Sequence, residues 1–158
     1  MYRSDKSINI AAVIEHLGPS QKSFYLIKEF NRALNHQEIC VSAFFEKSTV
    51  PVVPTMFSCK NVSFISGYHH NAISTTLGEA DILLKSSNNS RKFLYLWDLE
   101  WLYTPKKYSD VCKILLDDRL SILARSESHA NLIENFCNKK VIGVIDNWNL
   151  NQIIDILE

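Results

Sequence analysis

The chain has 158 residues, of which 46% are hydrophobic. This length is sufficient for one domain that buries on the order of 70% of the surface exposed by its unfolded chain. Lys plus Arg and Asp plus Glu both number 17, so the formal net charge is zero. Because a neutral chain creates no long-range field that attracts nucleic acid or an anionic membrane, we expect neither as a partner.

The four cysteines are far apart in the chain, and none has the Cys-x-x-Cys spacing typical of a zinc or redox site. Three of them, Cys40, Cys112 and Cys137, lie inside apolar runs, and we interpret these as small buried side chains in a reducing compartment. The first seven residues are polar, and no apolar run reaches the roughly 20 residues of a membrane span. We therefore expect a cytoplasmic protein that uses no metal and no cofactor.

The first structural unit predicted by the sequence is a strand followed by a loop and a helix. Residues 8–15 are a nearly continuous apolar run, as is typical of a strand buried on both faces of a parallel sheet. Gly18 and Pro19 then break the run, and Ser20 is placed to cap a helix. The apolar residues of that helix recur on one face at Phe24, Ile27, Phe30 and Ala33.

The same alternation continues to the end of the chain. Further strands are predicted at 39–45, 61–66, 81–86, 92–97, 120–124 and 141–145. Between them the pattern predicts a loop over 47–58, a short helix over 71–77, and later helices that start near Thr104-Pro105, Ser126 and Leu150. These elements indicate a single α/β domain over residues 1–158, with a Rossmann-like open, mostly parallel sheet of about six to seven strands and helices on both faces.

In an open sheet of this class, ligands bind beyond the carboxyl ends of the strands, where the strand order reverses. The residues predicted to lie there or beside it, and taken as candidate ligand or partner contacts, are His16, Gly18, Ser20, Tyr68, His70, Lys85, Trp97, Trp101, Arg125, Ser126 and Asn147. Several also have a purely structural interpretation. Ser20 and Ser126 are suitable helix caps, and a lysine such as Lys85 at the end of a strand commonly extends into water.

Two acids in the aromatic segment 93–103, Asp98 and Glu100, are the candidate catalytic carboxylates. If the strand continues past Trp97, side chains two residues apart point to the same side, and the two acids would raise each other's pKa. In the alternative, Asp98 begins a turn, Glu100 is exposed, and aromatic side chains cover the end of the sheet. The sequence shows no partner acid or base that decides between these interpretations.

Four segments carry a resemblance to a known family: INIAAVIEHLGPSQKSFYLIKEFNRAL, YLWDLEW, SILARSESHANLIENF and VIGVIDNWNL. In their order and weak motifs they resemble the N-terminal, acceptor-side domain of GT-B-type glycosyltransferases, especially the retaining group that transfers sugars from nucleotide donors. Two positions depart from the family's pattern. Trp97 stands where the family has His, and Trp148 stands where the family has the Gly of Asn-Gly.

The resemblance implies a sugar-like ligand, but it does not extend to the second domain that binds the sugar nucleotide in the family. Because a transferase must position donor and acceptor between two walls, we expect a binding or assembly module that is not catalytically competent alone. Its expected partner is another protein or a second copy of the chain. Such modules are compatible with a phage protein, which is made in the cytoplasm and incorporated into a virion.

The alternative is one half of a split or oligomeric glycosyltransferase. In that interpretation the resemblance makes Asp98 or Glu100 the base and Lys85 or Arg125 the ligand of the donor's phosphate.

Overall fold

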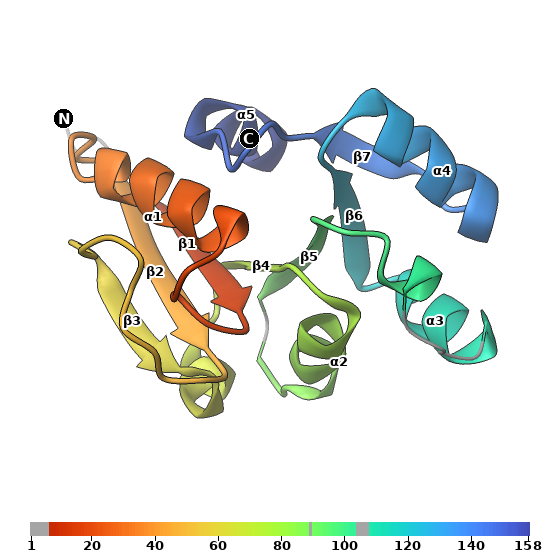
Figure 1. The fold of residues 1–158 in the computed structure, drawn as a ribbon, viewed down its shortest axis with the longest axis horizontal. Coiled ribbons are helices and arrows are strands. Elements are labelled where there is room, and N and C mark those ends of the chain that lie inside the picture. Colours follow the sequence, from red (N-terminus) through yellow and green to blue (C-terminus); the bar gives the residue numbers. More distant parts are fainter. Residues whose placement is uncertain (1–6, 89, 104–107) are drawn as a thin grey trace, which may run out of the picture.

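The computed structural model describes residues 7–88, 90–103 and 108–158. The strands are β1 (Ile8–Ile14), β2 (Ile39–Phe45), β3 (Ser58–Asn61), β4 (Asn71–Ser74), β5 (Arg91–Leu96), β6 (Leu120–Ala124) and β7 (Val141–Val144). All seven pair in parallel, in the order β3-β2-β1-β4-β5-β6-β7 (Figure 1). The strand order therefore reverses between β1 and β4, and the predicted Rossmann-like α/β fold is confirmed.

The helices are α1 (Gln21–Ala33), α2 (Leu77–Lys85), α3 (Tyr108–Leu115), α4 (Glu127–Cys137) and α5 (Leu150–Leu157), with short 3-10 turns η1 (Val62–Gly67) and η2 (Glu100–Leu102). One face of the sheet packs against α1 and α5, which lie along the upper side of Figure 1. The opposite face packs against η1, α2, α3 and α4. This division follows from right-handed crossovers, because the chain moves in one direction from β1 to β3 and in the other from β4 to β7.

The side chains of β5 show how the two faces are filled. Successive residues of a strand point to opposite sides. Phe93, Tyr95 and Trp97 pack on the side of α1 and α5, whereas Leu94 and Leu96 pack on the side of α2, α3 and α4. β5 is therefore buried on both faces, as its continuous apolar run in the sequence predicts.

Three predicted elements in the middle of the chain are wrong. The strand predicted at 61–66 is mostly the η1 turn, and β3 begins earlier, at the end of the predicted loop. Residues 71–74 form β4 instead of a helix, and most of the strand predicted at 81–86 belongs to α2. A four-residue strand is too short for its apolar residues to show a period. As a result, the helix was predicted where β4 lies and the strand where α2 lies.

Thr76 explains why α2 begins where it does. Its Oγ1 accepts a hydrogen bond from the amide of Glu79, and the Glu79 carboxylate accepts one from the Thr76 amide. This capping box satisfies two amides at the helix start. Leu77, Ala80 and Leu84 then fall on one buried face, so the apolar residues of this segment recur with the period of a helix.

The cysteines are only partly where the sequence places them. Cys112 and Cys137 are buried, but Cys40, near the start of β2, is exposed. The prediction for Cys40 is wrong because β2 is fully buried only at Ala43 and Phe44, and the residues at its start are less covered. Within the described ranges, no three His, Cys, Asp or Glu side chains are grouped to hold a metal ion. None of the described helices is both long and apolar enough to cross a membrane.

Gly143 allows α5 to approach β7, and this contact gives a first prediction. A Cβ at this position would lie 2.9 Å from Ile156 Cγ1 and closer still to Ile156 Cδ1. We expect Gly143→Ala to lower the free energy of unfolding by about 1–3 kcal/mol through overpacking, measured by urea denaturation. Ile156→Val removes Cδ1, so combining it with Gly143→Ala should recover part of the lost free energy of unfolding. The control is Gly67→Ala, where a Cβ meets nothing within 4 Å, and equal losses for both glycines would contradict the explanation.

Candidate functional site

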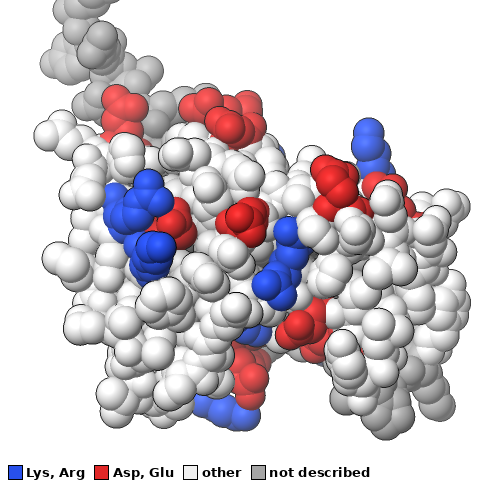
Figure 2. All heavy atoms as spheres, turned by 45° about the horizontal axis from the view of Figure 1, so that its top comes forward, with Lys and Arg blue, Asp and Glu red and all other residues white. Residues whose placement is uncertain are grey.

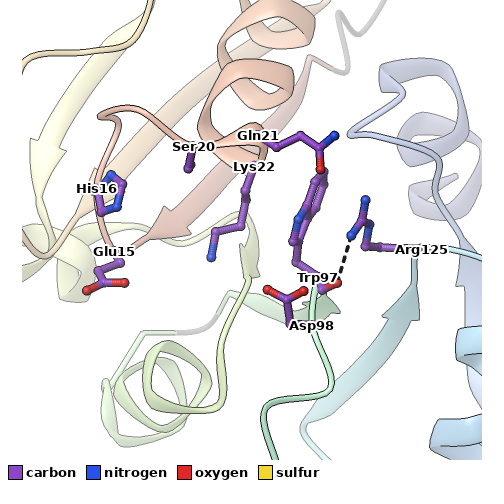
Figure 3. Close-up of a pocket in the computed structure, with 8 residues that line it drawn as sticks. All are labelled: Glu15, His16, Ser20, Gln21, Lys22, Trp97, Asp98 and Arg125. Atoms are coloured by element: carbon purple, nitrogen blue, oxygen red, sulfur yellow. Dashed lines mark hydrogen bonds between the residues drawn. The ribbon is translucent and has the colours of Figure 1, made fainter. Parts of the chain in front are cut away.

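A cavity of about 420 Å³ opens at the carboxyl edge of the sheet. Its lining comes from the ends of β1, β5 and β6 and from the first turn of α1, and consists of Glu15, His16, Ser20, Gln21, Lys22, Trp97, Asp98 and Arg125 (Figure 3). It lies beside the reversal of strand order between β1 and β4, where ligands of open α/β sheets bind. The fold therefore gives the same location as the sequence for a candidate site.

The loop between β1 and α1 is held by a short chain of hydrogen bonds. His16 Nδ1 accepts from the Gly18 amide at 3.0 Å, and Ser23 Oγ donates to the His16 carbonyl at 2.9 Å. Ser20 Oγ accepts from the Ser23 amide at 3.0 Å, which caps α1. Because Nδ1 is an acceptor, the neutral His16 ring carries its proton on Nε2, which makes that nitrogen the ring's remaining hydrogen-bond donor.

Gly18 supports this loop and does not line the cavity. A Cβ at Gly18 would lie 3.0 Å from Thr49 Oγ1 and 3.3 Å from His16 Nδ1. These separations are shorter than ordinary van der Waals contacts. Thr49, in the loop after β2, and the His16 ring therefore leave little room for a side chain at Gly18. Gly18 therefore contributes to the position of His16 through close packing.

The charged side chains of the cavity differ in their pairing. Glu15 Oε1 accepts a hydrogen bond of 2.6 Å from Lys47, and this bond holds the pKa of Glu15 below its usual value. Lys22 extends from α1 into the cavity (Figure 3). Within the described part of the chain, neither Lys22 nor Asp98 has an oppositely charged partner within 4.0 Å. Lys22 and Asp98 are therefore free to bind charged or polar groups of a ligand.

Arg125 and Trp97 form a stacked pair at the edge of the cavity. The guanidinium carbon of Arg125 lies 3.9 Å from the centroid of the Trp97 ring, and Arg125 Nη1 donates to the Trp97 carbonyl at 3.3 Å. The indole is otherwise part of the core, with 5% of its surface exposed. Trp97 thus serves mainly as a rigid support for Arg125, which is half-exposed and carries further N–H donors.

The two candidate catalytic acids do not form a pair at one site. Asp98 is exposed and lines the cavity, but Glu100 Oε2 accepts a 2.7 Å hydrogen bond from the Leu77 amide at the start of α2. A carboxylate at that position satisfies a free amide and interacts favourably with the helix dipole. Glu100 therefore holds α2, and the next residue, Trp101, stacks on Phe136 of α4 at a centroid distance of 4.5 Å.

Three predicted site residues lie at the opposite edge of the sheet. Tyr68 and His70 precede β4, so they lie at its amino end, where His70 lines a different cavity together with Asn9 and Arg91. Lys85 is the last residue of α2 and forms an ion pair with Asp81 one helical turn earlier. The structure does not bring these residues to the carboxyl edge, because the elements predicted to carry them were wrong.

Two further predicted residues have local structural roles. Ser126 caps α4, and its Oγ accepts from the His129 amide at 3.2 Å. Asn147 lies in the turn after β7 with a positive φ of 46°, a conformation that Asn adopts more easily than most residues. Neither residue lines the cavity defined above.

Lys22 and Glu15 are cavity residues that the prediction did not select. Lys22 is the second residue of α1, and it lies two positions after the Ser20 cap that the sequence does indicate. A helix that follows a parallel strand starts at the carboxyl edge, so its first turn is a detectable signal for site residues. Glu15 was treated as the last residue of the strand, and its partner Lys47 is 32 positions away, so the ion pair has no local signature.

Acidic and basic groups are mixed on the face of the molecule shown in Figure 2. On the face shown in Figure 2, Lys and Arg alternate with Asp and Glu and form no large patch of one sign. Both kinds of side chain also surround the indentation at the lower edge of that view. On this face the mixture of signs agrees with the zero net charge of the chain.

The cavity combines hydrogen-bond donors and acceptors. Its acceptors include the carboxylates of Glu15 and Asp98, and its donors include His16, Lys22 and Arg125. Comparisons of the chain with models of protein families, with curated proteins and with solved structures found no match. The functional assignment therefore depends on the geometry and chemistry of this cavity.

Proposed function

We propose that the chain is a glycosyltransferase-like binding module whose cavity takes a sugar-like ligand. The observation that carries the proposal is the mixture of donors and acceptors around one cavity, with Lys22 and Asp98 lacking ion-pair partners in the described part of the chain. Each hydroxyl of a sugar both donates and accepts hydrogen bonds. A polyhydroxylated ring would therefore satisfy carboxylate, ammonium and imidazole groups at the same time.

Two of the acids at or near the cavity are already engaged, which limits the groups that could act as a general base. A general base must be free to accept a proton near the working pH. Glu15 is held as a carboxylate by Lys47, with its pKa below the usual value, and Glu100 is engaged at the start of α2. Asp98 is the remaining acid among the residues that line the cavity.

We expect Asp98→Asn to weaken binding of a monosaccharide about tenfold, because hydrogen bonds to a charged acceptor contribute about 1.5–3 kcal/mol. The measurement is saturation-transfer NMR with a panel of neutral hexoses and pentoses, followed by titration of any sugar that binds. Asp81→Asn, on α2 at the opposite edge, is the matched control and should leave the affinity unchanged. The proposal fails if no sugar of the panel binds, or if the two variants bind equally.

The competing proposal is one half of a split or oligomeric glycosyltransferase. Of the residues that it requires, Asp98 and Arg125 line the cavity, whereas Glu100 and Lys85 do not. Calorimetry with nucleotide sugars separates the two proposals. Saturable binding by the isolated chain, with sugar transfer that is lost in Asp98→Asn, would replace the binding module by a transferase.

A second proposed role is assembly with a protein partner or another copy of the chain. Four side chains on η2, α3 and α4 and their flanks are more than half exposed: Leu102, Tyr103, Tyr108 and Leu132. They lie near the stacked pair of Trp101 and Phe136, and Tyr108 contacts the Phe136 ring edge to face at 5.2 Å. Such clusters of Tyr, Trp and Leu are typical of interaction surfaces. A cytoplasmic pool and a place in a phage particle are further proposals of this kind.

We expect the double variant Tyr103→Ser with Leu132→Ser to remove self-association, measured by sedimentation velocity between about 10 and 200 μM, a range that detects dimers held by about 6 kcal/mol. Met56→Ser removes an equally exposed apolar side chain from the loop before β3 and serves as the control. A wild-type chain that stays monomeric at the highest concentration would rule out assembly with another copy.

A further inference from the structure

Of the arginines that the structure describes, Arg91 and Arg125 form no ion pair, and Arg91 lines the cavity at the opposite edge of the sheet whereas Arg125 lines the candidate site. Arg32 and Arg119 bond to the carboxylates of Glu29 and Asp117, but Arg125 has no carboxylate within 4.0 Å in the described ranges. Its one hydrogen bond there is the 3.3 Å bond to the Trp97 carbonyl. A guanidinium has five N–H donors, so most of those on Arg125 are left for a ligand.

Arg125 is also held in place before any ligand arrives. Its guanidinium stacks on the ring of Trp97, which is only 5% exposed, and its Nη1 donates a hydrogen bond to the Trp97 carbonyl. An arginine that is already ordered loses less side-chain entropy when it binds. Its planar fork then matches two oxygens of a carboxylate or phosphate.

The charges around the cavity also favour an anionic group. Lys22 and Arg125 supply two positive charges, and Asp98 supplies one negative charge. The remaining acid, Glu15, is already neutralised by Lys47 at 2.6 Å. With that pair set aside, the lining has an excess of positive charge, so an oxyanion would be attracted without the cost of separating an existing ion pair involving Arg125.

From these observations we infer that Arg125 is the oxyanion receptor of the cavity, and that the ligand is a sugar-like molecule carrying a phosphate or carboxylate group. The sugar-like part of this inference rests on the proposed function. The oxyanion accepts a bidentate pair of hydrogen bonds from Arg125. The hydroxyls of the same ligand donate to Asp98 and accept from His16 or Lys22.

Four probes test the inference on the wild-type chain: glucose, glucose 6-phosphate, glucuronate and inorganic phosphate. Glucose and glucuronate differ only at the sixth carbon, so their comparison isolates the charge. We expect the charged sugars to bind about tenfold more tightly than glucose, as a charged bidentate pair predicts, and more weakly as salt increases. If only glucose 6-phosphate binds more tightly than glucose, the ligand carries a phosphate. If only glucuronate does, the ligand carries a carboxylate.

Variants locate the effect at Arg125. Arg125→Gln removes the charge, whereas Arg125→Lys keeps the charge but not the planar fork, and both should remove most of the preference for charged sugars. Lys28→Gln, on the exposed side of α1, is the control and should keep it. Because Arg125 stacks on Trp97, an oxyanion bound to its guanidinium should also change the tryptophan fluorescence, and Trp97→Phe should abolish that signal.

The outcomes separate the inference from the proposed function. Equal affinities for glucose, glucose 6-phosphate and glucuronate would overturn the inference and leave the sugar-binding function intact. If inorganic phosphate binds and no sugar does, Arg125 is an anion receptor and the sugar-like part is wrong. An anion preference that persists in Arg125→Gln would overturn the assignment of the receptor, and no binding of any probe would overturn both proposals.

Discussion

Replacing Glu79 with Gln is expected to raise the free energy of unfolding at pH 8 by about 3 kcal/mol relative to the wild type, and to leave it nearly unchanged at pH 4. Glu79 is fully buried in the first turn of α2, behind the carboxyl edge of β4. Burial raises its pKa from 4.5 to about 7, against the weaker opposing effects of Lys22 and the hydrogen bonds from Thr75. A carboxylate at this position is therefore costly at neutral and higher pH.

The hydrogen bonds of Glu79 explain why Gln is a suitable replacement. Oε2 accepts from the Thr75 amide at 2.7 Å, the Thr75 hydroxyl at 2.8 Å and the Thr76 amide at 3.0 Å. Oε1 is buried and has no hydrogen-bond partner among the described residues. The amide oxygen of Gln takes the place of Oε2, and its nitrogen occupies the place of the protonated oxygen. The capping box is kept while the ionisable group is removed.

The sign of the pH dependence follows from the direction of the shift. Below about pH 4.5 the carboxyl is protonated in both states, so it has no effect on the pH dependence. Between 4.5 and about 7 the folded state keeps a proton that the unfolded state releases, so stability falls as pH rises through this range. Above pH 7 the loss is complete. The nearest charged groups that modulate this titration are Lys22 and Glu46.

Urea denaturation of the wild type and Glu79→Gln at intervals from pH 4 to pH 8 measures the effect. The two stability curves should meet near pH 4 and separate by about 3 kcal/mol at pH 8. Glu38→Gln, at an exposed position just before β2, is the control and should follow the wild-type curve. Parallel curves for the wild type and Glu79→Gln over the whole range would show that Glu79 does not titrate in this way.

The same turn shows what limited the prediction of the fold from the sequence. β1, β2, β5, β6 and β7 were predicted because each is mostly apolar and is bounded by polar or turn residues. β4 contains four residues, and α2 follows it after two threonines. Thr76-Leu77-Gly78-Glu79 is the sequence signature of a capping box. Recognising that signal would have placed the start of α2 correctly and indicated that residues 71–74 before it form a strand.

The positions of the predicted site residues depend partly on whether the element before them was predicted correctly. His16, Ser20, Trp97, Asp98 and Arg125 lie at the ends of correctly predicted strands or in the loops that follow them, and all five line the cavity. Lys85 was attached to an element of the wrong type, so the rule about carboxyl ends was applied to the wrong edge. The role of Glu100 depends on a hydrogen bond to a residue 23 positions earlier, which no local pattern shows.

The backbone of Trp148 gives a second prediction with a large effect. We expect the variant Trp148→Gly to be more stable than the variant Trp148→Ala. Trp148 is fully buried, packs edge to face on Phe30 and Tyr95, and has a positive φ of 61°. Removing the indole should cost about 3–5 kcal/mol in Trp148→Ala. The left-handed backbone costs an L-residue about 1–2 kcal/mol, which alanine keeps and glycine avoids.

Glycine normally destabilises relative to alanine by about 0.5–1 kcal/mol, since its unfolded chain is more flexible. At Trp148 the relief of the left-handed conformation exceeds this penalty, so the order should reverse, with Trp148→Gly about 1 kcal/mol more stable in urea denaturation. The same pair of substitutions at Trp101, whose φ is not positive, should show the normal order. If alanine is more stable than glycine at both positions, the surrounding core does not hold residue 148 in the left-handed region, and the buried indole alone selects that backbone conformation.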